Sequence, residues 1–323
     1  QVIFGTGPVG RAAAAFLLDR GLRVRMVNRS GKRPELFPAL TPAKEARLEV
    51  VGADAMDASA VHSAGAGASH IYNCAHAPYH QWERILPALY ANMASAALQE
   101  DAVLAVAQNL YMYARGLDVI DDQARVDPPS RKGRIIQRLH ARLEEAGARD
   151  GLRWTAVRAS DFYGPGATEQ SLFGTVRFLD PLFAGKPAML IGDIDQPHTF
   201  TYVGDYGRAL AVAALAPQAH GRAWIVPNDR TLSTREVAGL FFSAARRSPR
   251  IRRVPRAGIA LAGLFDPVIR EVLEVLYQKE EPYVVNGSDF RAAFHMDPTP
   301  LEEGVKRTLE WYEPFRGGRA GSR

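Results

Sequence analysis

Cysteine and long apolar runs are the scarcest features of this 323-residue sequence. Cys74 is its single cysteine, which excludes an internal disulfide framework and a thiolate metal site. No stretch approaches the roughly 18 to 20 unbroken apolar residues that a membrane span requires. No secretory leader is visible, and Gln1–Phe4 already has the composition of a strand, so we expect a few residues to precede it. These absences predict a cytoplasmic protein without a membrane partner.

The composition is that of a globular protein with a large core. Hydrophobic residues make up 47% of the chain and charged residues 23%, which excludes disorder. The net charge is +5, but the basic residues are scattered, and the densest internal run, 246–253, is typical of a solvated surface. We therefore expect no nucleic-acid partner. No group of His, Asp and Glu has metal-ligand spacing, and we expect no metal.

The first half alternates short β-rich runs with helical stretches, the pattern of a parallel sheet. The expected strands are Val2–Phe4, Arg23–Val27, Leu48–Val51, His70–Cys74, Ala102–Ala107 and Trp154–Arg158. The expected helices, by their apolar spacing, are Gly10–Arg20, Trp82–Leu98 and Lys132–Glu145. Six strands with helices between them predict an α/β doubly wound parallel sheet of the Rossmann type.

The regular alternation ends at Tyr163-Gly164-Pro165-Gly166. We predict a dinucleotide-binding domain over 1–164 and a smaller, mostly α substrate domain over 165–323, with segments near 199–226 packing back on the first. Asp205 is expected to cap a helix that ends at Ala216, and Trp224–Val226 to form a strand. Ser233–Glu236 has the pattern of a capping start, and the last helix is expected to open at Thr299–Glu303 and to end near Tyr312.

A Gly-rich turn follows the first expected strand and matches G-x-G-x-x-G. Its residues are Gly5, Thr6, Gly7, Pro8, Val9 and Gly10. The pattern alone is weak, but here a strand precedes it, an Ala-rich helix follows it and a second strand ends about 20 residues later. Backbone N–H groups at such a helix start hold a diphosphate. The turn predicts a nicotinamide dinucleotide site.

The end of the second expected strand indicates which dinucleotide. Proteins that bind NAD place Asp or Glu there, on the ribose 2′-hydroxyl, whereas this chain has Asn28-Arg29-Ser30. Arg29 can pair with a 2′-phosphate, and Arg11 or Lys32 can assist. NADP is therefore preferred over NAD; the alternative is that Arg29 is only a solvated loop charge.

Several motifs in the right order resemble the extended or atypical short-chain dehydrogenase/reductase superfamily, the NAD-dependent epimerase/dehydratase family. Beyond the Gly-rich turn, 52–57 is similar to the family's G-D-x-x-D segment, and 73–77 to its strand-end H-x-A-A. The segment 157–166 is similar to L-R-x-x-x-x-Y-G-P-G, and 198–205 resembles a further family element. The resemblance covers almost the whole chain. It implies cofactor contacts from Asp54, Ala55, Cys74, Ala75, His76, Lys132, Ala159, Ser160 and Phe162.

The chain departs from this family at the residues that move a proton. Members usually carry Ser or Thr after the fifth strand and Tyr-x-x-x-Lys on the next helix, where the Lys lowers the pKa of the Tyr. Matching Tyr113 to the family's strand-end Y-G places Asn109 at the Ser position. Lys132 is the counterpart of the family Lys, and the Tyr position is Pro128. Asn109 can donate a hydrogen bond to a carbonyl but cannot relay a proton.

Another group must then supply the proton if there is chemistry. Tyr113 is the first candidate, with Lys132 and Asn109 as the other catalytic residues. His76, Tyr111 and Tyr163 are candidates for substrate contacts, because strand ends on one edge of a parallel sheet converge. A packed aromatic is the commoner role for each Tyr and a loop residue for His76. For Lys132 two roles are equally open, a contact with the nicotinamide ribose and a surface residue at the helix start.

Two functions fit these observations. The first is an NADP-dependent oxidoreductase, or an epimerase or dehydratase that transfers hydride transiently, acting on a small polar or sugar-like substrate. The alternative is an inactive NADP(H)-binding sensor or regulatory protein, which the loss of Ser and Tyr favours. The retained Lys132 and the full-sized second domain favour the enzyme. The helices 82–98 and 132–145 supply either a homodimer face or only a cover for the sheet.

Overall fold

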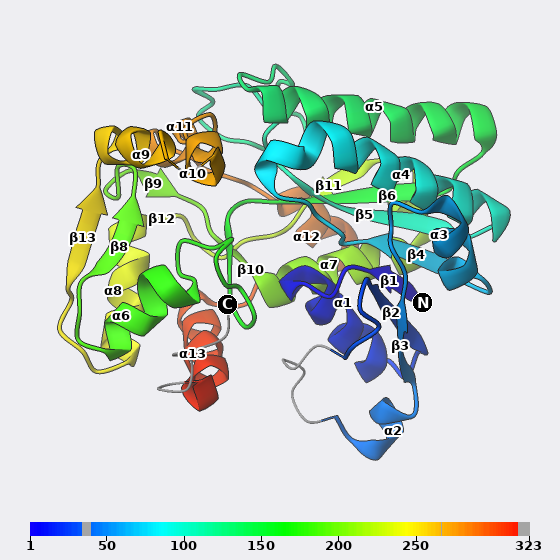
Figure 1. Cartoon of the computed structure of the whole chain (residues 1–323), viewed down its shortest axis with the longest axis horizontal. Coiled ribbons are helices and arrows are strands. Elements are labelled where there is room, and N and C mark those ends of the chain that lie inside the picture. The colour runs from blue at the N-terminus through cyan, green and yellow to red at the C-terminus, as the bar shows by residue number, and fades with distance from the viewer. Residues whose placement is uncertain (34–39, 266, 316–323) are drawn as a thin grey trace.

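A seven-stranded parallel sheet runs through the chain, of which the computed structural model describes residues 1–33, 40–265 and 267–315 (Figure 1). The sheet confirms the doubly wound architecture. In spatial order its strands are β11 (Ala223–Ile225), β6 (Trp154–Ala159), β5 (Val103–Asn109), β4 (His70–Asn73), β1 (Val2–Phe4), β2 (Val24–Asn28) and β3 (Leu48–Gly52). Every neighbouring pair is parallel, so both faces must be covered by helices.

Two layers of helices cover the sheet. One face carries α3 (Ala58–Gly65), α4 (Trp82–Gln99) and α5 (Arg131–Asp150), and the other α1 (Pro8–Asp19), α7 (Val203–Leu215) and α12 (Ser288–Phe294). The short helix α3 was not predicted from the sequence, although Asp57 caps it by accepting from the N–H groups of Ser59 and Ala60. A helix of eight residues carries too little periodicity to be recognised. No helix in the described part of the chain is long and apolar enough to cross a membrane.

The direction of winding reverses at β1. The chain moves from β1 outward to β2 and β3, then returns to the other side of β1 with β4 and continues to β5 and β6. The segments that follow β1 and β4 therefore leave towards opposite faces of the sheet, and the space between them is the crevice where open α/β sheets bind ligands. The Gly-rich turn leaves β1 at this edge, and Cys74 and Ala75 leave β4 beside it.

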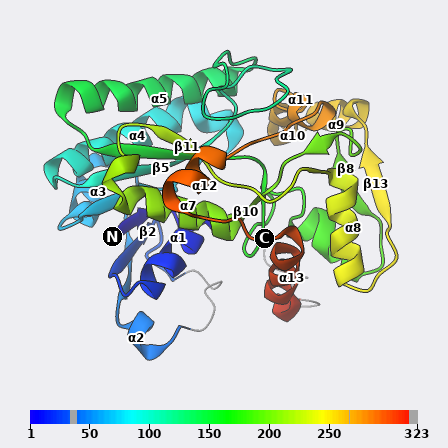
Figure 2. The same cartoon turned by 180° about the vertical axis from the view of Figure 1, so that it is seen from behind.

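The C-terminal part has its own core, rich in aromatic side chains. Its strands form small pairs: β7 (Phe162–Tyr163) with β10 (Thr201–Tyr202), β8 (Ala188–Ile191) with β13 (Ile251–Val254), and β9 (Pro197–His198) with β12 (Leu232–Ser233). Its helices are α6 (Asp180–Phe183), α8 (Thr234–Ala244), α9 (Arg256–Gly263), α10 (Pro267–Val272), α11 (Tyr277–Glu280) and α13 (Leu301–Tyr312). Seen from either side, α9, α10 and α11 lie beyond the end of the sheet at which the crevice opens (Figures 1 and 2). The remaining helix, α2 (Pro42–Glu45), precedes β3.

Three sequence predictions at helix ends have different outcomes. Ser233 and Glu236 form the predicted capping box, and α13 ends at Tyr312 as predicted. The cap assigned to Asp205 is wrong, because α7 begins at Val203 and Asp205 lies inside its first turn, buried. Its carboxylate instead accepts from the backbone N–H and hydroxyl of Thr299, 94 residues away, a pairing that no local pattern shows.

The chain also returns to the first half after entering the second. The α7 helix packs on α1, and β11, the strand predicted at Trp224–Val226, pairs with β6 as the seventh strand. Gly207 is the contact point, since a Cβ there would lie 2.4 Å from the backbone N of Ala13. The boundary at residue 164 stays a prediction.

Candidate cofactor and active site

The three glycines of the Gly-rich turn are required for different physical reasons. Gly5 has φ +108°, and a Cβ there would lie 2.5 Å from the carbonyl carbon of Cys74. A Cβ on Gly10 would lie 2.1 Å from the carbonyl oxygen of Gly5, so the helix could not approach the strand. Gly7 has nothing within 4 Å of its Cβ position and is exposed. Two glycines thus pack the turn tightly and the third leaves open space at the helix start.

The start of α1 suits an anion. Gly7 is its N-cap residue without a side-chain hydrogen bond, and Pro8 occupies the first turn, where its missing N–H costs nothing. No acidic side chain lies in that turn. The free N–H groups and the positive end of the helix dipole therefore face the crevice, beside the half-buried Thr6 and Val9. The turn and the open space at Gly7 fit a dinucleotide diphosphate.

A local network shapes the loop after β2. Asn28 Oδ1 accepts from the backbone N–H and the hydroxyl of Ser30, and Asn28 Nδ2 donates to the carbonyl of Lys32 at 2.8 Å. Arg29 projects from this loop with an exposed side chain. Within residues 1–33, 40–265 and 267–315 it has no ion pair or hydrogen bond through its side chain. The three residues of the NADP prediction thus form one small unit with a free cation.

The segment after β3 lies on the same edge of the sheet. Asp54 is exposed and one carboxylate oxygen accepts from the backbone N–H of Met56 at 3.0 Å. The carbonyl of Ala55 accepts from Asn92 Nδ2 of α4 at the same distance, which fixes the segment against the sheet. The second carboxylate oxygen of Asp54 remains available to a ligand such as an adenine amino group.

Aromatic side chains gather where β4 and β5 end. The Tyr79 and Tyr111 hydroxyls lie 2.6 Å apart, and the ring of Trp82 stacks on Tyr111 with centroids 5.9 Å apart. His76 is exposed and meets Trp82 edge-on at 4.9 Å, while Cys74 and Ala75 precede it. Asn109 Oδ1 accepts from the Tyr111 backbone N–H at 3.0 Å, and its Nδ2 group has no acceptor in the described part of the chain. Burial raises the pKa of both Tyr79 and Tyr111.

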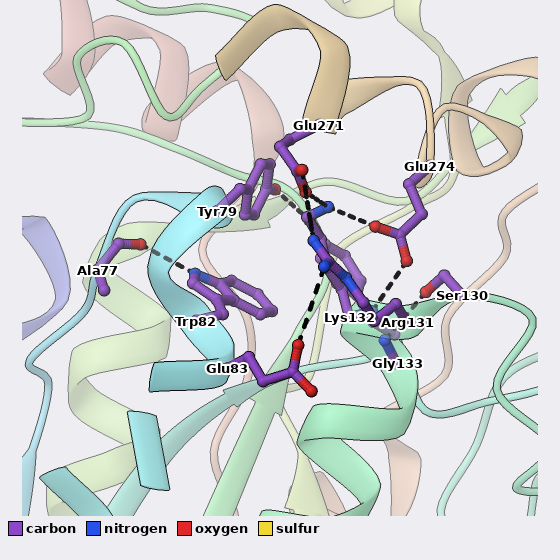
Figure 3. A network of polar contacts seen from close by, with 11 residues as sticks. Ala77, Tyr79, Trp82, Glu83, Ser130, Arg131, Lys132, Gly133, Glu271 and Glu274 are labelled. Carbon is purple, nitrogen blue, oxygen red and sulfur yellow. Dashed lines mark hydrogen bonds and ion pairs between the residues drawn. The ribbon is translucent and has the colours of Figure 1, made fainter. Parts of the chain in front are cut away.

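Lys132 lies in the first turn of α5, beside this aromatic group (Figure 3). Its side chain is almost fully buried, and Nζ lies 2.5 Å from a Glu271 oxygen and 2.6 Å from a Glu274 oxygen. Its backbone N–H also donates to Glu274, and Nζ stands 5.1 Å from the Tyr79 ring centroid. The Lys132 ammonium lowers the pKa of Glu271, against the opposing effect of burial. The two glutamates come from α10 and the turn after it.

Tyr113 does not lie with Tyr111. It is 2% exposed, and its hydroxyl accepts from Arg158 Nη1 at 2.7 Å, with Arg158 itself buried on β6. Burial raises the pKa of Tyr113, against the effect of Arg158. The side chain faces the core under α4 and α5. In this position Tyr113 satisfies a buried guanidinium, and reaching a substrate would require that contact to break.

The segment after β6 has both buried and partly exposed residues. Ala159 and Ser160 are buried, and the Ser160 hydroxyl donates to the carbonyl of Thr199 at 2.6 Å; Phe162 is half-buried. Tyr163 is 1% exposed and packs in the C-terminal core with Tyr202. The Tyr163 hydroxyl lies so close to Gly304 that a Cβ on Gly304 would be 2.4 Å from it. This placement does not support the predicted substrate contact of Tyr163.

Sequence reasoning missed a group of three titratable side chains at the same edge, of which His198 is buried and the other two are partly exposed. Asp161, two residues after the end of β6, accepts from His198 Nε2 at 2.8 Å and forms an ion pair with Lys279 of α11. Burial lowers the pKa of Lys279 to about 7 and that of His198 to about 4. Each residue sits in an unrelated segment, so no spacing could have indicated the group.

The structure therefore brings some of the predicted residues together and separates others. Asn109, Tyr111 and Lys132 meet at the carboxyl ends of β4 and β5, joined by Tyr79, Glu271 and Glu274, which the sequence did not indicate. Tyr113 and Tyr163 lie in cores. Among the described residues no group of three or more His, Cys, Asp or Glu side chains could hold a metal ion.

Comparison with solved structures finds the same fold over nearly the whole chain. DesIV, a dTDP-glucose 4,6-dehydratase from Streptomyces venezuelae solved with NAD and TYD, is 17% identical with a TM-score of 0.75, over 98% of this chain and 97% of that one. UDP-glucose 4-epimerase from Thermus thermophilus, solved with NAD, is 19% identical with a TM-score of 0.76, over 97% and 98%. MoeE5, solved with UDP-glucose and NAD, is 18% identical with a TM-score of 0.77, also over 97% and 98%.

Sequence comparison gives a consistent result. No curated protein sequence matches the chain. The family model described as "NAD dependent epimerase/dehydratase family" matches residues 2–226, which include the Gly-rich turn, Lys132 and the strand β11. The resemblance inferred from the motifs is thereby confirmed, and the chain belongs to the NAD dependent epimerase/dehydratase family.

Proposed function

We propose that the protein binds NADP(H) on its Gly-rich turn and transfers hydride to or from a small polar or sugar-like substrate. The observation that carries the coenzyme preference is the Asn28–Ser30 loop. It has no carboxylate to repel a 2′-phosphate, and it presents Arg29 with no competing ion pair among the described residues. The solved neighbours with NAD support a nicotinamide dinucleotide, whereas the choice of NADP rests on this chain's own loop.

The substrate class is supported by the family and by the site. The similar structures include a dTDP-glucose dehydratase and a UDP-glucose epimerase, both of which act on nucleotide sugars. The crevice of this chain offers polar groups of the kind that bind hydroxyls, among them the Asn109 amide and the partly exposed Asp161 carboxylate. Aromatic rings at Tyr79 and Tyr111 line the same edge and suit the apolar face of a sugar ring.

The geometry favours Tyr111 over Tyr113 as the proton donor. When bound, the coenzyme supplies or accepts the hydride. The Tyr111 hydroxyl donates a proton to the substrate oxygen, and the free Asn109 Nδ2 group donates a hydrogen bond to the same oxygen. Tyr79, 2.6 Å from Tyr111, passes its own hydroxyl proton to Tyr111 and regains one from solvent. Because burial raises both pKa values, both hydroxyls hold their protons at neutral pH, and Tyr111 gives its proton up only when hydride transfer makes the substrate oxygen strongly basic.

One observation favours the alternative, a coenzyme-binding protein without turnover. The Lys132 ammonium lies between two carboxylates of the C-terminal part rather than open to the crevice. In that position it neutralises Glu271 and Glu274, and its ammonium is less available for hydrogen bonds to the nicotinamide ribose. NADPH binding without oxidation across aldehydes, ketones, enones and nucleotide sugars would support this alternative.

Coenzyme titration of Arg29→Ala tests the proposed preference. The variant loses a charge-assisted contact with the 2′-phosphate, so the Kd for NADPH should rise about 10- to 100-fold while that for NADH stays within about twofold. Arg33→Ala is the matched control, because Arg33 is a nearby exposed arginine that already pairs with Glu45. An equal loss for both coenzymes in Arg29→Ala would contradict the NADP preference.

A further inference from the structure

Arg11, the residue after the third glycine, is a desolvated cation beside the crevice. It is half-buried on α1, and burial lowers its pKa to about 10. No carboxylate pairs with it in the part of the chain that the structure describes. Among the described residues its side chain makes one hydrogen bond, from Nη2 to the carbonyl oxygen of Gly166, at 3.2 Å. Removing a guanidinium from water is costly unless an anion compensates it, so this environment suits an anionic ligand.

The turn at Gly166 is shaped around this guanidinium. Gly166 has φ +79°, and a Cβ there would lie 2.2 Å from Arg11 Nη2. Any other residue would therefore be strained in the backbone and would displace the arginine. Two segments 155 residues apart are thus built to keep one cation in place. A surface arginine needs no such arrangement.

The order of the strands indicates which phosphate group of the coenzyme Arg11 can bind. The turn at Gly166 follows β6 and β7, and β6 lies on the β4 side of β1. Arg29 follows β2, on the opposite side of β1. Because the Arg11 guanidinium is hydrogen-bonded to Gly166, it points away from the Asn28–Ser30 loop, which would bind the adenosine ribose. It stays near the start of α1, where the open space at Gly7 fits a diphosphate.

We propose that Arg11, held by the carbonyl of Gly166, binds the diphosphate of the nicotinamide coenzyme, and that Arg29 alone serves the 2′-phosphate. This rests on the proposed function, in that the Gly-rich turn must bind such a coenzyme. It replaces the sequence-based expectation that Arg11 assists at the 2′-phosphate. It also gives the Gly164–Gly166 turn a role. Through the hydrogen bond between Arg11 and Gly166, this turn connects the coenzyme site at α1 to the segment that leads into the C-terminal part.

Isothermal titration with four probes separates the two arginines. NADPH carries both groups, NADH and ADP-ribose carry only the diphosphate, and adenosine 2′-phosphate carries only the 2′-phosphate. Arg11→Ala should weaken NADPH, NADH and ADP-ribose by about 10- to 100-fold and adenosine 2′-phosphate by less than about threefold. Arg29→Ala should weaken NADPH and adenosine 2′-phosphate and spare NADH and ADP-ribose.

Two further variants guard against an effect of folding. Arg20→Ala removes an equal charge from the far end of α1, where the guanidinium lies over the Phe16 ring, and should leave all four Kd values unchanged. Gly166→Ala should reproduce the loss of NADH and ADP-ribose by displacing the Arg11 guanidinium. The melting temperature of each coenzyme-free variant shows whether it is folded.

Each outcome decides a different claim. If Arg11→Ala weakens NADPH and adenosine 2′-phosphate but spares NADH and ADP-ribose, Arg11 serves the 2′-phosphate and the inference is wrong. If it spares all four, or if Gly166→Ala alone loses affinity, the arginine only packs against the turn and the inference is equally wrong. If the wild-type protein binds neither coenzyme, the proposed function itself fails.

Discussion

The Gly-rich turn and the Lys132 network lie on the same edge of the sheet and are built in opposite ways. The turn takes six consecutive residues and works through the absence of side chains, with backbone packed against backbone. The network takes charged side chains from α5 and from the segment 271–274, about 140 residues later, and works through charge balance. The first can be inferred from its sequence, and the second becomes visible only when the chain is folded.

The two regions also differ in what a substitution does to them. In the turn, one added methyl group meets backbone atoms that have no room to move. In the network, removal of the Lys132 charge leaves two neighbouring carboxylates with only Arg131 to compensate them. Stability should therefore fall when side-chain volume is added in the turn and when a charge is removed from the network. Substitutions of matched size can separate these two effects.

The largest effect on stability is expected at Gly10. In Gly10→Ala the new Cβ would lie 2.1 Å from the Gly5 carbonyl oxygen, and the strand-to-helix turn must open. We expect a loss of about 3 kcal/mol in the free energy of unfolding, measured by urea denaturation. Coenzyme affinity should fall in the same variant, because the helix start moves with the turn.

Gly239→Ala is the matched control for this substitution. Gly239 lies in α8, with nothing within 4 Å of its Cβ position. Alanine is the better helix former, so this variant should gain about 0.5 to 1 kcal/mol. If Gly10→Ala were equally harmless, close backbone packing would not be the reason for glycine in the turn.

The next effect is expected from removing the charge of Lys132. Lys132→Met leaves Glu271 with Arg131 as its one cation and Glu274 with none among the described residues, although their side chains are only 15% and 25% exposed. We expect a loss of about 2 to 3 kcal/mol in the free energy of unfolding. Lys44→Met removes the exposed pair with Asp19 instead and should cost less than about 0.5 kcal/mol. Similar losses in the two variants would show that the network is no stronger than a surface ion pair.

The pH dependence of the same variant gives an independent check. The folded pKa of Glu271 lies below its ordinary value, so this carboxylate stabilises the fold at pH values above about 4.3, the pKa of an unfolded Glu. That contribution disappears as the pH falls through the folded pKa. The stability difference between wild type and Lys132→Met should therefore be largest near neutral pH and shrink on acidification towards pH 3. A difference that stays constant would exclude the carboxylates as its source.

Prediction from the sequence succeeded where the determinant is local. The Gly5–Gly10 turn, the capping box at Ser233 and the strand at Trp224–Ile225 each depend on neighbouring residues, and the fold followed from their order. It failed where a side chain chooses a distant partner. Asp205 carries the pattern of a cap and binds Thr299 instead, and nothing near Lys132 indicates Glu271. Tyr111 and Tyr113 are two positions apart in sequence, but only the folded contacts show that the first borders the crevice and the second meets Arg158.

That last contrast gives the smallest expected change in stability. In Tyr113→Phe the buried Arg158 loses the hydroxyl that accepts from its Nη1, and its Nη2 already has no hydrogen-bond partner within the described residues. We expect a loss of about 1 to 2 kcal/mol in the free energy of unfolding and turnover within about twofold of wild type. Tyr111→Phe should reduce kcat about 100-fold or more, because it removes the proposed proton donor, and should cost about 1 kcal/mol through the lost hydrogen bond to Tyr79. Thermal unfolding and coenzyme-linked turnover on both variants check the pair. If Tyr113→Phe lost turnover while Tyr111→Phe kept it, the sequence-based choice of Tyr113 would be restored, and the Arg158 contact would have to open during the reaction.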